Sequence, residues 1–202
     1  MSAAEGKPAV ARRRQPTREE LLAAAGADVR VRDVIAPGLR VLFCGINPGL
    51  LTAYTGHHFA RPGNRFWPAL HRAGFTERQL DPSEERTLLD RGYGITNVVP
   101  RVTATAAELA PEEYVEGGRL LRAKLAEYRP RVLAVLGVGA YRLAFDQPKA
   151  GLGEQAAGIE GTRVWVLPNP SGLNAHYQLD ALAALFREVR LAADRLAAAP
   201  AG

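Results

Sequence analysis

The sequence predicts a three-layer α/β/α sandwich around a central, mainly parallel sheet of about four to five strands. Four short apolar runs, at 40–44, 95–99, 132–136 and 163–167, have the composition of buried strands. Strands of a parallel sheet are buried on both faces and therefore read as continuous apolar runs. Helical stretches lie between these runs, and strands that alternate with helices indicate a parallel sheet covered on both sides.

Capping signals predict the first helices. Thr17-Arg18-Glu19-Glu20 has the spacing of a capping box and opens a short helix that ends near Gly26. A second helix is expected over 64–72, with Asn64 as its cap and Pro68 tolerated in its first turn. Asp81-Pro82-Ser83-Glu84 caps a third, in which Glu84 and Glu85 are interpreted as helix-start charges.

The remaining helices are indicated by their length and by apolar periodicity. One is expected over 111–128, where Pro130 stops it, and a short one includes Leu143. The last is expected over 178–198, and its apolar residues form a stripe that faces the core: Leu179, Leu182, Leu185, Phe186 and Val189.

Composition suits one globular domain, which we place at 17–198 after a basic, disordered tail at 1–16. Arg12–Arg14 in this tail either contact phosphates or are simply solvated. No apolar stretch approaches the roughly 18–20 residues that span a bilayer. A single cysteine, Cys44, excludes an internal disulfide and any four-cysteine zinc or iron–sulfur site. The net charge of +5 fits a polyanionic partner without establishing one.

Two loops predict the functional site. Gly45-Ile46-Asn47-Pro48-Gly49-Leu50 follows the apolar run 41–44, and Asn169-Pro170-Ser171-Gly172-Leu173 follows the run 164–167. Open α/β folds place ligands at the carboxyl ends of their strands. Glycine in such a loop lets backbone amides approach a ligand closely. A third segment, Gly56-His57-His58-Phe59-Ala60-Arg61-Pro62-Gly63-Asn64-Arg65-Phe66-Trp67, lies between them.

With these three segments the chain, from about Leu39 to about Phe186, resembles the mismatch-specific uracil-DNA and thymine-DNA glycosylase family. The resemblance implies the uracil-DNA glycosylase fold and an enzyme that flips a base out of DNA and hydrolyses its N-glycosidic bond. It implies that Asn47 holds the attacking water. An amide cannot remove a proton, so Asn47 is expected to orient water and not to act as a base. The alternative is a turn residue before proline.

The resemblance also implies a base pocket formed by Gly45, Ile46, His58, Phe59 and Asn97. The backbone N–H groups of Ile46 and Phe59 grip the base, and the Phe59 ring stacks on it. Phe59 as a core aromatic is the alternative. His58 is expected to hydrogen-bond the base or a phosphate, and a metal site at His57-His58 is disfavoured. Asn97 is either an accessory site residue or an ordinary polar group at a strand end.

The loop Ser171-Gly172-Leu173-Asn174 is implied to be the wedge. Leu173 is the apolar residue that fills the space of the flipped base, unless it is a core leucine. Gly172 and Asn174 stand at the positions whose backbone groups, in the resembling enzymes, recognise the guanine opposite the flipped base. Asn174-Ala175-His176 replaces a serine and an arginine of the common bacterial pattern, which puts insertion and guanine preference in question.

We therefore expect a monofunctional glycosylase that needs no cofactor and no metal and binds double-stranded DNA with a mismatched or damaged base. We expect a monomer in the bacterial cytoplasm, associated with the nucleoid. The alternatives are a non-catalytic DNA-binding module on the same fold and a small-molecule nucleotide-binding α/β enzyme. The absence of a Gly-Lys-Ser/Thr phosphate loop disfavours the latter.

Overall fold

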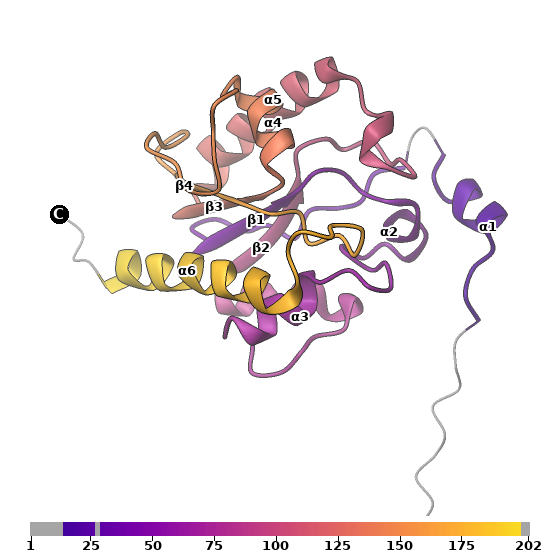
Figure 1. The fold of residues 1–202 in the computed structure, drawn as a ribbon, viewed down its shortest axis with the longest axis horizontal. Coiled ribbons are helices and arrows are strands. Elements are labelled where there is room, and N and C mark those ends of the chain that lie inside the picture. The colour runs from indigo at the N-terminus through magenta and orange to yellow at the C-terminus, as the bar shows by residue number, and fades with distance from the viewer. Residues whose placement is uncertain (1–13, 27–28, 199–202) are drawn as a thin grey trace, which may run out of the picture.

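The computed structural model describes residues 14–26 and 29–198, and its centre is a five-stranded sheet in the order β2-β1-β3-β5-β4 (Figure 1). The strands β1 (Val41–Gly45), β2 (Tyr93–Asn97), β3 (Val132–Leu136) and β5 (Arg163–Leu167) are parallel. The edge strand β4 (Gly153–Glu154) is antiparallel to β5. The predicted α/β/α fold with a mainly parallel sheet is confirmed.

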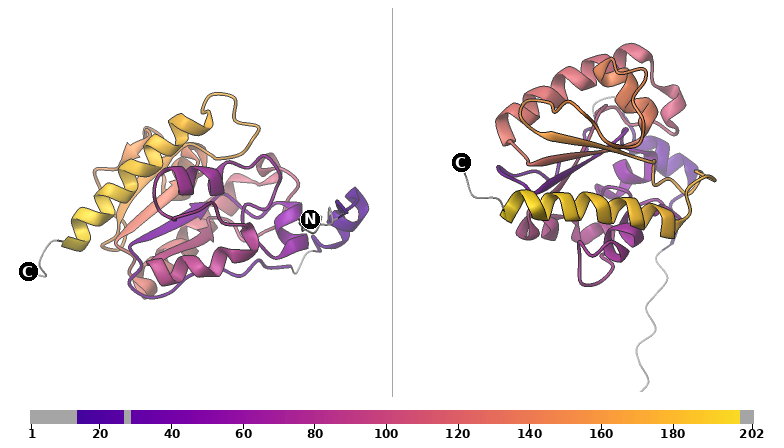
Figure 2. Two further views of the ribbon diagram at one scale, coloured as in Figure 1. Left: turned by 90° about the horizontal axis from the view of Figure 1, so that it is seen from below. Right: turned by 60° about the vertical axis from the view of Figure 1, so that its left-hand side comes forward.

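Helices cover both faces of the sheet, as Figure 2 shows. One face carries α3 (Phe66–Arg72), the 3₁₀ helix η1 (Pro82–Arg91) and α6 (Leu179–Ala198). The other carries α4 (Pro111–Tyr128) and α5 (Val138–Phe145). No helix in the described part of the chain is long and apolar enough to cross a membrane.

An aromatic cluster joins the first face to the sheet. The ring of Phe43 on β1 stacks on Phe186 of α6, with 5.6 Å between the ring centroids, and meets Phe66 of α3 edge-on at 5.4 Å. Burying these three aromatic rings against one another contributes several kcal/mol, because each ring removes more than about 150 Å² of surface from water. This packing fixes the start of α3 next to the end of β1.

Several element boundaries differ from the predicted ones. The strand expected at 95–99 is Tyr93–Asn97, and a bridge pairs its Ile95 with Val34. A side chain at Gly94 would lie 2.4 Å from the Val34 carbonyl oxygen, so glycine permits this pairing. The helix expected from Asn64 starts at Phe66, although the Asn64 side-chain oxygen accepts a hydrogen bond from the Phe66 N–H at 2.9 Å.

Two short helices complete the N-terminal half. The capping box at Thr17 is confirmed, and α1 (Arg18–Ala23) follows it. The helix α2 (Leu50–Thr55) was not predicted, and α1 contacts it. A short 3₁₀ turn, η2 (Ala106–Glu108), precedes α4. Of the expected basic tail, 1–13 lie outside the described residues, including Arg12 and Arg13, whose contact with phosphates was in question. Arg14 is described, and its guanidinium forms an ion pair with Glu20.

Candidate active site

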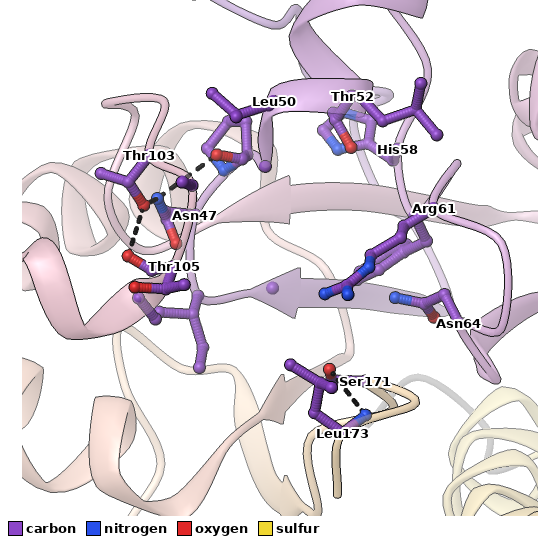
Figure 3. Close-up of a pocket in the computed structure, with 18 of the residues that line it drawn as sticks. Asn47, Leu50, Thr52, His58, Arg61, Asn64, Thr103, Thr105, Ser171 and Leu173 are labelled. Atoms are coloured by element: carbon purple, nitrogen blue, oxygen red, sulfur yellow. Dashed lines mark hydrogen bonds between the residues drawn. The ribbon is translucent and has the colours of Figure 1, made fainter. Parts of the chain in front are cut away.

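A pocket of about 800 Å³ opens where the parallel strands end (Figure 3). In the register of the sheet, Gly45 at the end of β1 lies beside Asn97 at the end of β2. Leu136 ends β3, and Asn169 follows β5 by two residues; all four residues line the pocket. Parallel topology thus brings the two predicted loops and the predicted strand-end asparagine to one cavity.

The side-chain amide of Asn47 has a fixed orientation. Its nitrogen donates to the Thr103 hydroxyl at 2.7 Å, to the Arg101 carbonyl at 2.9 Å and, more weakly, to the Pro48 carbonyl at 3.3 Å. The Thr103 hydroxyl cannot donate back, because it donates to the Thr105 carbonyl at 2.8 Å. The amide oxygen therefore points away from Thr103, as Figure 3 shows, and is available as an acceptor in the pocket.

Asn97 is oriented in the same manner, through His58. The His58 Nε2 lies 3.1 Å from the Arg32 carbonyl, which can only accept, so Nε2 carries the proton. In the neutral ring Nδ1 is then an acceptor, and the Asn97 amide nitrogen lies 3.4 Å from it. The Asn97 oxygen consequently faces Gly45, where an added side chain would come within 2.5 Å of it. Both ring nitrogens of His58 have protein partners, so this buried ring holds Asn97.

Phe59 stands in a left-handed backbone conformation, with φ 55°. For an aromatic residue this conformation is unfavourable and must be held by its surroundings. The peptide groups around His58 are held on both sides, because the His58 N–H donates to Glu85 at 2.7 Å and Trp67 Nε1–H donates to the His58 carbonyl at 3.1 Å. The half-buried Phe59 ring stacks on Phe66 with 4.1 Å between centroids and lines the pocket.

Two backbone donors border this pocket without a protein acceptor. Across residues 14–26 and 29–198, neither the Ile46 N–H nor the Phe59 N–H donates to a protein group. These are the two amides expected to grip a base. The ring of Phe59 lies close to Gly45: an added Cβ there would be 3.2 Å from the ring and 2.5 Å from the Asn97 side-chain oxygen, so glycine permits both to approach the end of β1.

The second loop presents Leu173 to solvent. Its side chain is 72% exposed, which rules out the alternative of a core leucine. The Ser171 N–H donates to the Asn169 side chain at 3.0 Å, and the Leu173 N–H donates to the Ser171 hydroxyl at 3.3 Å. The Asn174 amide folds back onto the Asn169 carbonyl at 3.0 Å. Gly172 packs against the 61–65 segment, where a Cβ would lie 2.6 Å from the Gly63 carbonyl oxygen.

Sequence patterns missed several residues of this site. Thr103 and Glu85 belong to no motif; Glu85 was interpreted only as a helix-start charge, yet its carboxylate is buried and also lies 3.4 Å from His57 Nδ1. Arg61 was quoted only as part of a motif, and it lines the pocket as an exposed cation. Residues from the N-terminal segment also line the pocket, and no local signal would have placed them there: Gln15, Pro16 and Leu21.

Three further properties concern the residues that could take part in other chemistry. Among the described residues, no group of three or more histidine, cysteine, aspartate or glutamate side chains could hold a metal ion. Cys44 precedes Gly45 but is fully buried, and burial raises the pKa of its thiol far above its ordinary value, so it stays protonated. No lysine of the described chain lines the pocket.

Comparison with known proteins places this site in a family context. The Uracil DNA glycosylase superfamily profile matches residues 32–191, which include every segment of the pocket except the N-terminal one. The fold is similar to the solution NMR structure of a candidate uracil DNA glycosylase from Methanosarcina acetivorans. That similarity has a TM-score of 0.53 at 18% sequence identity and covers 80% of this chain and 97% of the other.

The buried Glu85 carboxylate gives a prediction about stability. Glu85→Ala leaves the His58 N–H buried without an acceptor and should lower the free energy of unfolding by about 1–3 kcal/mol, measured by urea denaturation. Glu85→Gln keeps an acceptor oxygen and should lose less. Glu116→Ala is the matched control, because Glu116 forms only an exposed ion pair with Arg119. Equal losses in the two alanine variants would show that Glu85 does not hold this loop.

Proposed function

The chain belongs to the uracil-DNA glycosylase superfamily, and from that premise we propose that it is a monofunctional DNA glycosylase of base-excision repair. Its substrate is uracil, and also thymine or a damaged pyrimidine, in G·U and G·T mismatches of double-stranded DNA. The observation that carries the proposal is the Asn47 amide, whose nitrogen is fully occupied by protein acceptors while its oxygen is directed into the pocket.

Asn47 supplies the position of the attacking water. Its side-chain oxygen accepts a hydrogen bond from the water and directs the water at C1′ of the flipped nucleotide. Because an amide has no useful basicity, it does not withdraw the proton. Leaving-group stabilisation is therefore the larger contribution, as the departing base carries negative charge on its carbonyl oxygens. The Ile46 and Phe59 N–H groups, fixed before the reaction, are suited to that charge.

The pocket selects a base with a donor on its pairing edge. Asn97 presents its side-chain oxygen, since its nitrogen faces His58. The N3–H of uracil or thymine is a suitable partner for this oxygen. The Phe59 ring, supported from behind by Phe66, provides the stacking surface. Gly45 lets both the Asn97 oxygen and the Phe59 ring lie close to the end of β1, where a Cβ would be 2.5 Å and 3.2 Å from them.

Two exposed groups at the rim are suited to the DNA. Leu173 extends from the second loop and would occupy the stack that the flipped base vacates. Arg61 forms no ion pair with a described residue and is placed to contact a backbone phosphate. The absence of a lysine among the described pocket residues favours hydrolysis alone over a lyase step that proceeds through a Schiff base. We further propose a monomer that acts in the cytoplasm on nucleoid DNA.

The direct test is incubation of the full chain with labelled duplexes that carry uracil or thymine opposite guanine or adenine, followed by alkaline cleavage. We expect cleavage of the G·U duplex, and we expect it to persist after treatment with a chelator. Binding of the duplexes without any cleavage would instead indicate the non-catalytic DNA-binding module. Activity that a chelator abolishes would contradict the metal-free mechanism.

Asn47→Ala should reduce the single-turnover rate on the G·U duplex by about 10²-fold or more, because the water loses its positioning group. DNA binding, measured by fluorescence anisotropy, should be largely retained. Gln155→Ala is a control, since the Gln155 amide also donates to backbone carbonyls but lies outside the pocket. A rate for Asn47→Ala within threefold of wild type would remove Asn47 from the mechanism.

Leu173→Ala should reduce the rate on duplex DNA far more than on single-stranded uracil DNA, because only a duplex has a stack to fill. The melting temperature should stay unchanged, as the side chain is exposed. Leu191→Ala, which truncates an exposed leucine of α6, is the matched control. Equal losses on the two substrates, together with a lower melting temperature, would refute the wedge.

A further inference from the structure

The guanidinium group of Arg65 is the main polar connection between the segment 61–65 and the second loop. Its Nη1 donates to the Asn174 carbonyl at 2.9 Å and to the Tyr177 carbonyl at 2.5 Å, and its Nη2 donates to the Gly172 carbonyl at 3.2 Å. The backbone N–H of Arg65 donates to the Pro170 carbonyl at 2.9 Å. One residue therefore fixes the carbonyl groups on both sides of Leu173.

Arg65 has no other partner that would explain its position. It forms no ion pair with a carboxylate among residues 14–26 and 29–198. The close packing of Gly172 on Gly63 already sets where the loop lies. Arg65 adds orientation, because a planar guanidinium with several fixed donors determines the direction of the carbonyls that it contacts.

The same two carbonyls, of Gly172 and Asn174, flank the wedge residue and belong to the loop that would face the orphan base. A carbonyl oxygen has two lone pairs, so each can accept from Arg65 and still accept a second hydrogen bond. The pairing edge of guanine offers two neighbouring donors, N1–H and the N2 amino group. Adenine offers one amino group and, at N1, an acceptor that a carbonyl oxygen repels.

We propose that Arg65 is a specificity-determining positioning residue, which orients the Gly172 and Asn174 carbonyls so that the loop selects guanine opposite the target base. The inference rests on the proposed glycosylase function. Arg65 itself contacts neither the target base nor the attacking water. Its loss should therefore change the discrimination between opposite bases and spare the chemistry of the pocket.

The test compares single-turnover rates of wild type, Arg65→Met and Arg65→Lys on duplexes with uracil opposite guanine or adenine, and on single-stranded uracil DNA. In Arg65→Met the ratio of the G·U rate to the A·U rate should fall by about tenfold, the factor expected when a charged donor to a carbonyl is lost. The rate on single-stranded DNA should stay within twofold of wild type. Arg65→Lys keeps the charge and should give an intermediate ratio.

Arg190→Met is the matched control. Arg190 lies on α6, away from the pocket, and its guanidinium also donates to a backbone carbonyl, that of Ala73, at 2.9 Å. Its ratio should equal that of wild type. The inference is overturned if Arg65→Met keeps the wild-type G·U to A·U rate ratio. It is also overturned if the wild-type protein itself cuts the two duplexes at nearly equal rates. If a thermal melt shows that Arg65→Met is unfolded, the G·U to A·U rate ratio of Arg65→Lys decides. The inference is then overturned if that ratio equals the wild-type value.

Failure of the proposed function gives a different result. The wild-type protein would then cut neither the duplexes nor the single-stranded DNA. That result would contradict both the proposed function and the role of Arg65. Wild-type cleavage with a G·U preference that survives in Arg65→Met removes the role of Arg65 alone.

Discussion

The close approach of Asn97 and Phe59 to Gly45 is the constraint on which the rest of this site depends. A Cβ at the end of β1 would lie 2.5 Å from the Asn97 side-chain oxygen and 3.2 Å from the Phe59 ring, so glycine at this position permits both contacts. Parallel pairing brings Asn97 alongside Gly45, and the aromatic cluster around Phe43 brings the segment that carries Phe59 to the same point. A base that enters the pocket would meet an acceptor, a ring and two unpaired amides around one glycine.

The residues proposed to contact the substrate are held in place by other residues of the protein. Thr103 sets the orientation of the Asn47 amide, His58 sets that of Asn97, and Glu85 holds the His58 N–H next to the strained residue Phe59. Such supporting contacts fix the direction of the polar groups before a ligand binds. Electrostatic stabilisation of a leaving group requires this preorganisation. Arg65 does the same for the second loop, at the side of the site that would face the opposite strand.

Element prediction succeeded where a local pattern carried the signal. The buried runs became β1, β3 and β5 within a residue of the expected limits, and the helix predicted over 111–128 was observed with those bounds. Two of the missed elements, α2 and β4, have no such signal. The helix α2 contains two threonines and a tyrosine, which are weak helix formers, and β4 has two residues that become a strand only by pairing with β5. Glycine inside β2 concealed the start of that strand in the same way.

The sequence by itself determined the four parallel strands, the longer helices and the loops that carry the site, because these depend on apolar periodicity, capping residues and short motifs. Only the tertiary structure decided which polar groups orient those loops. The contacts of Asn47 with Thr103, of His58 with Glu85 and of Arg65 with Asn174 join residues 56, 27 and 109 positions apart. Hydrogen bonds of this kind leave no periodicity in the chain, since they depend on where folding brings two distant side chains.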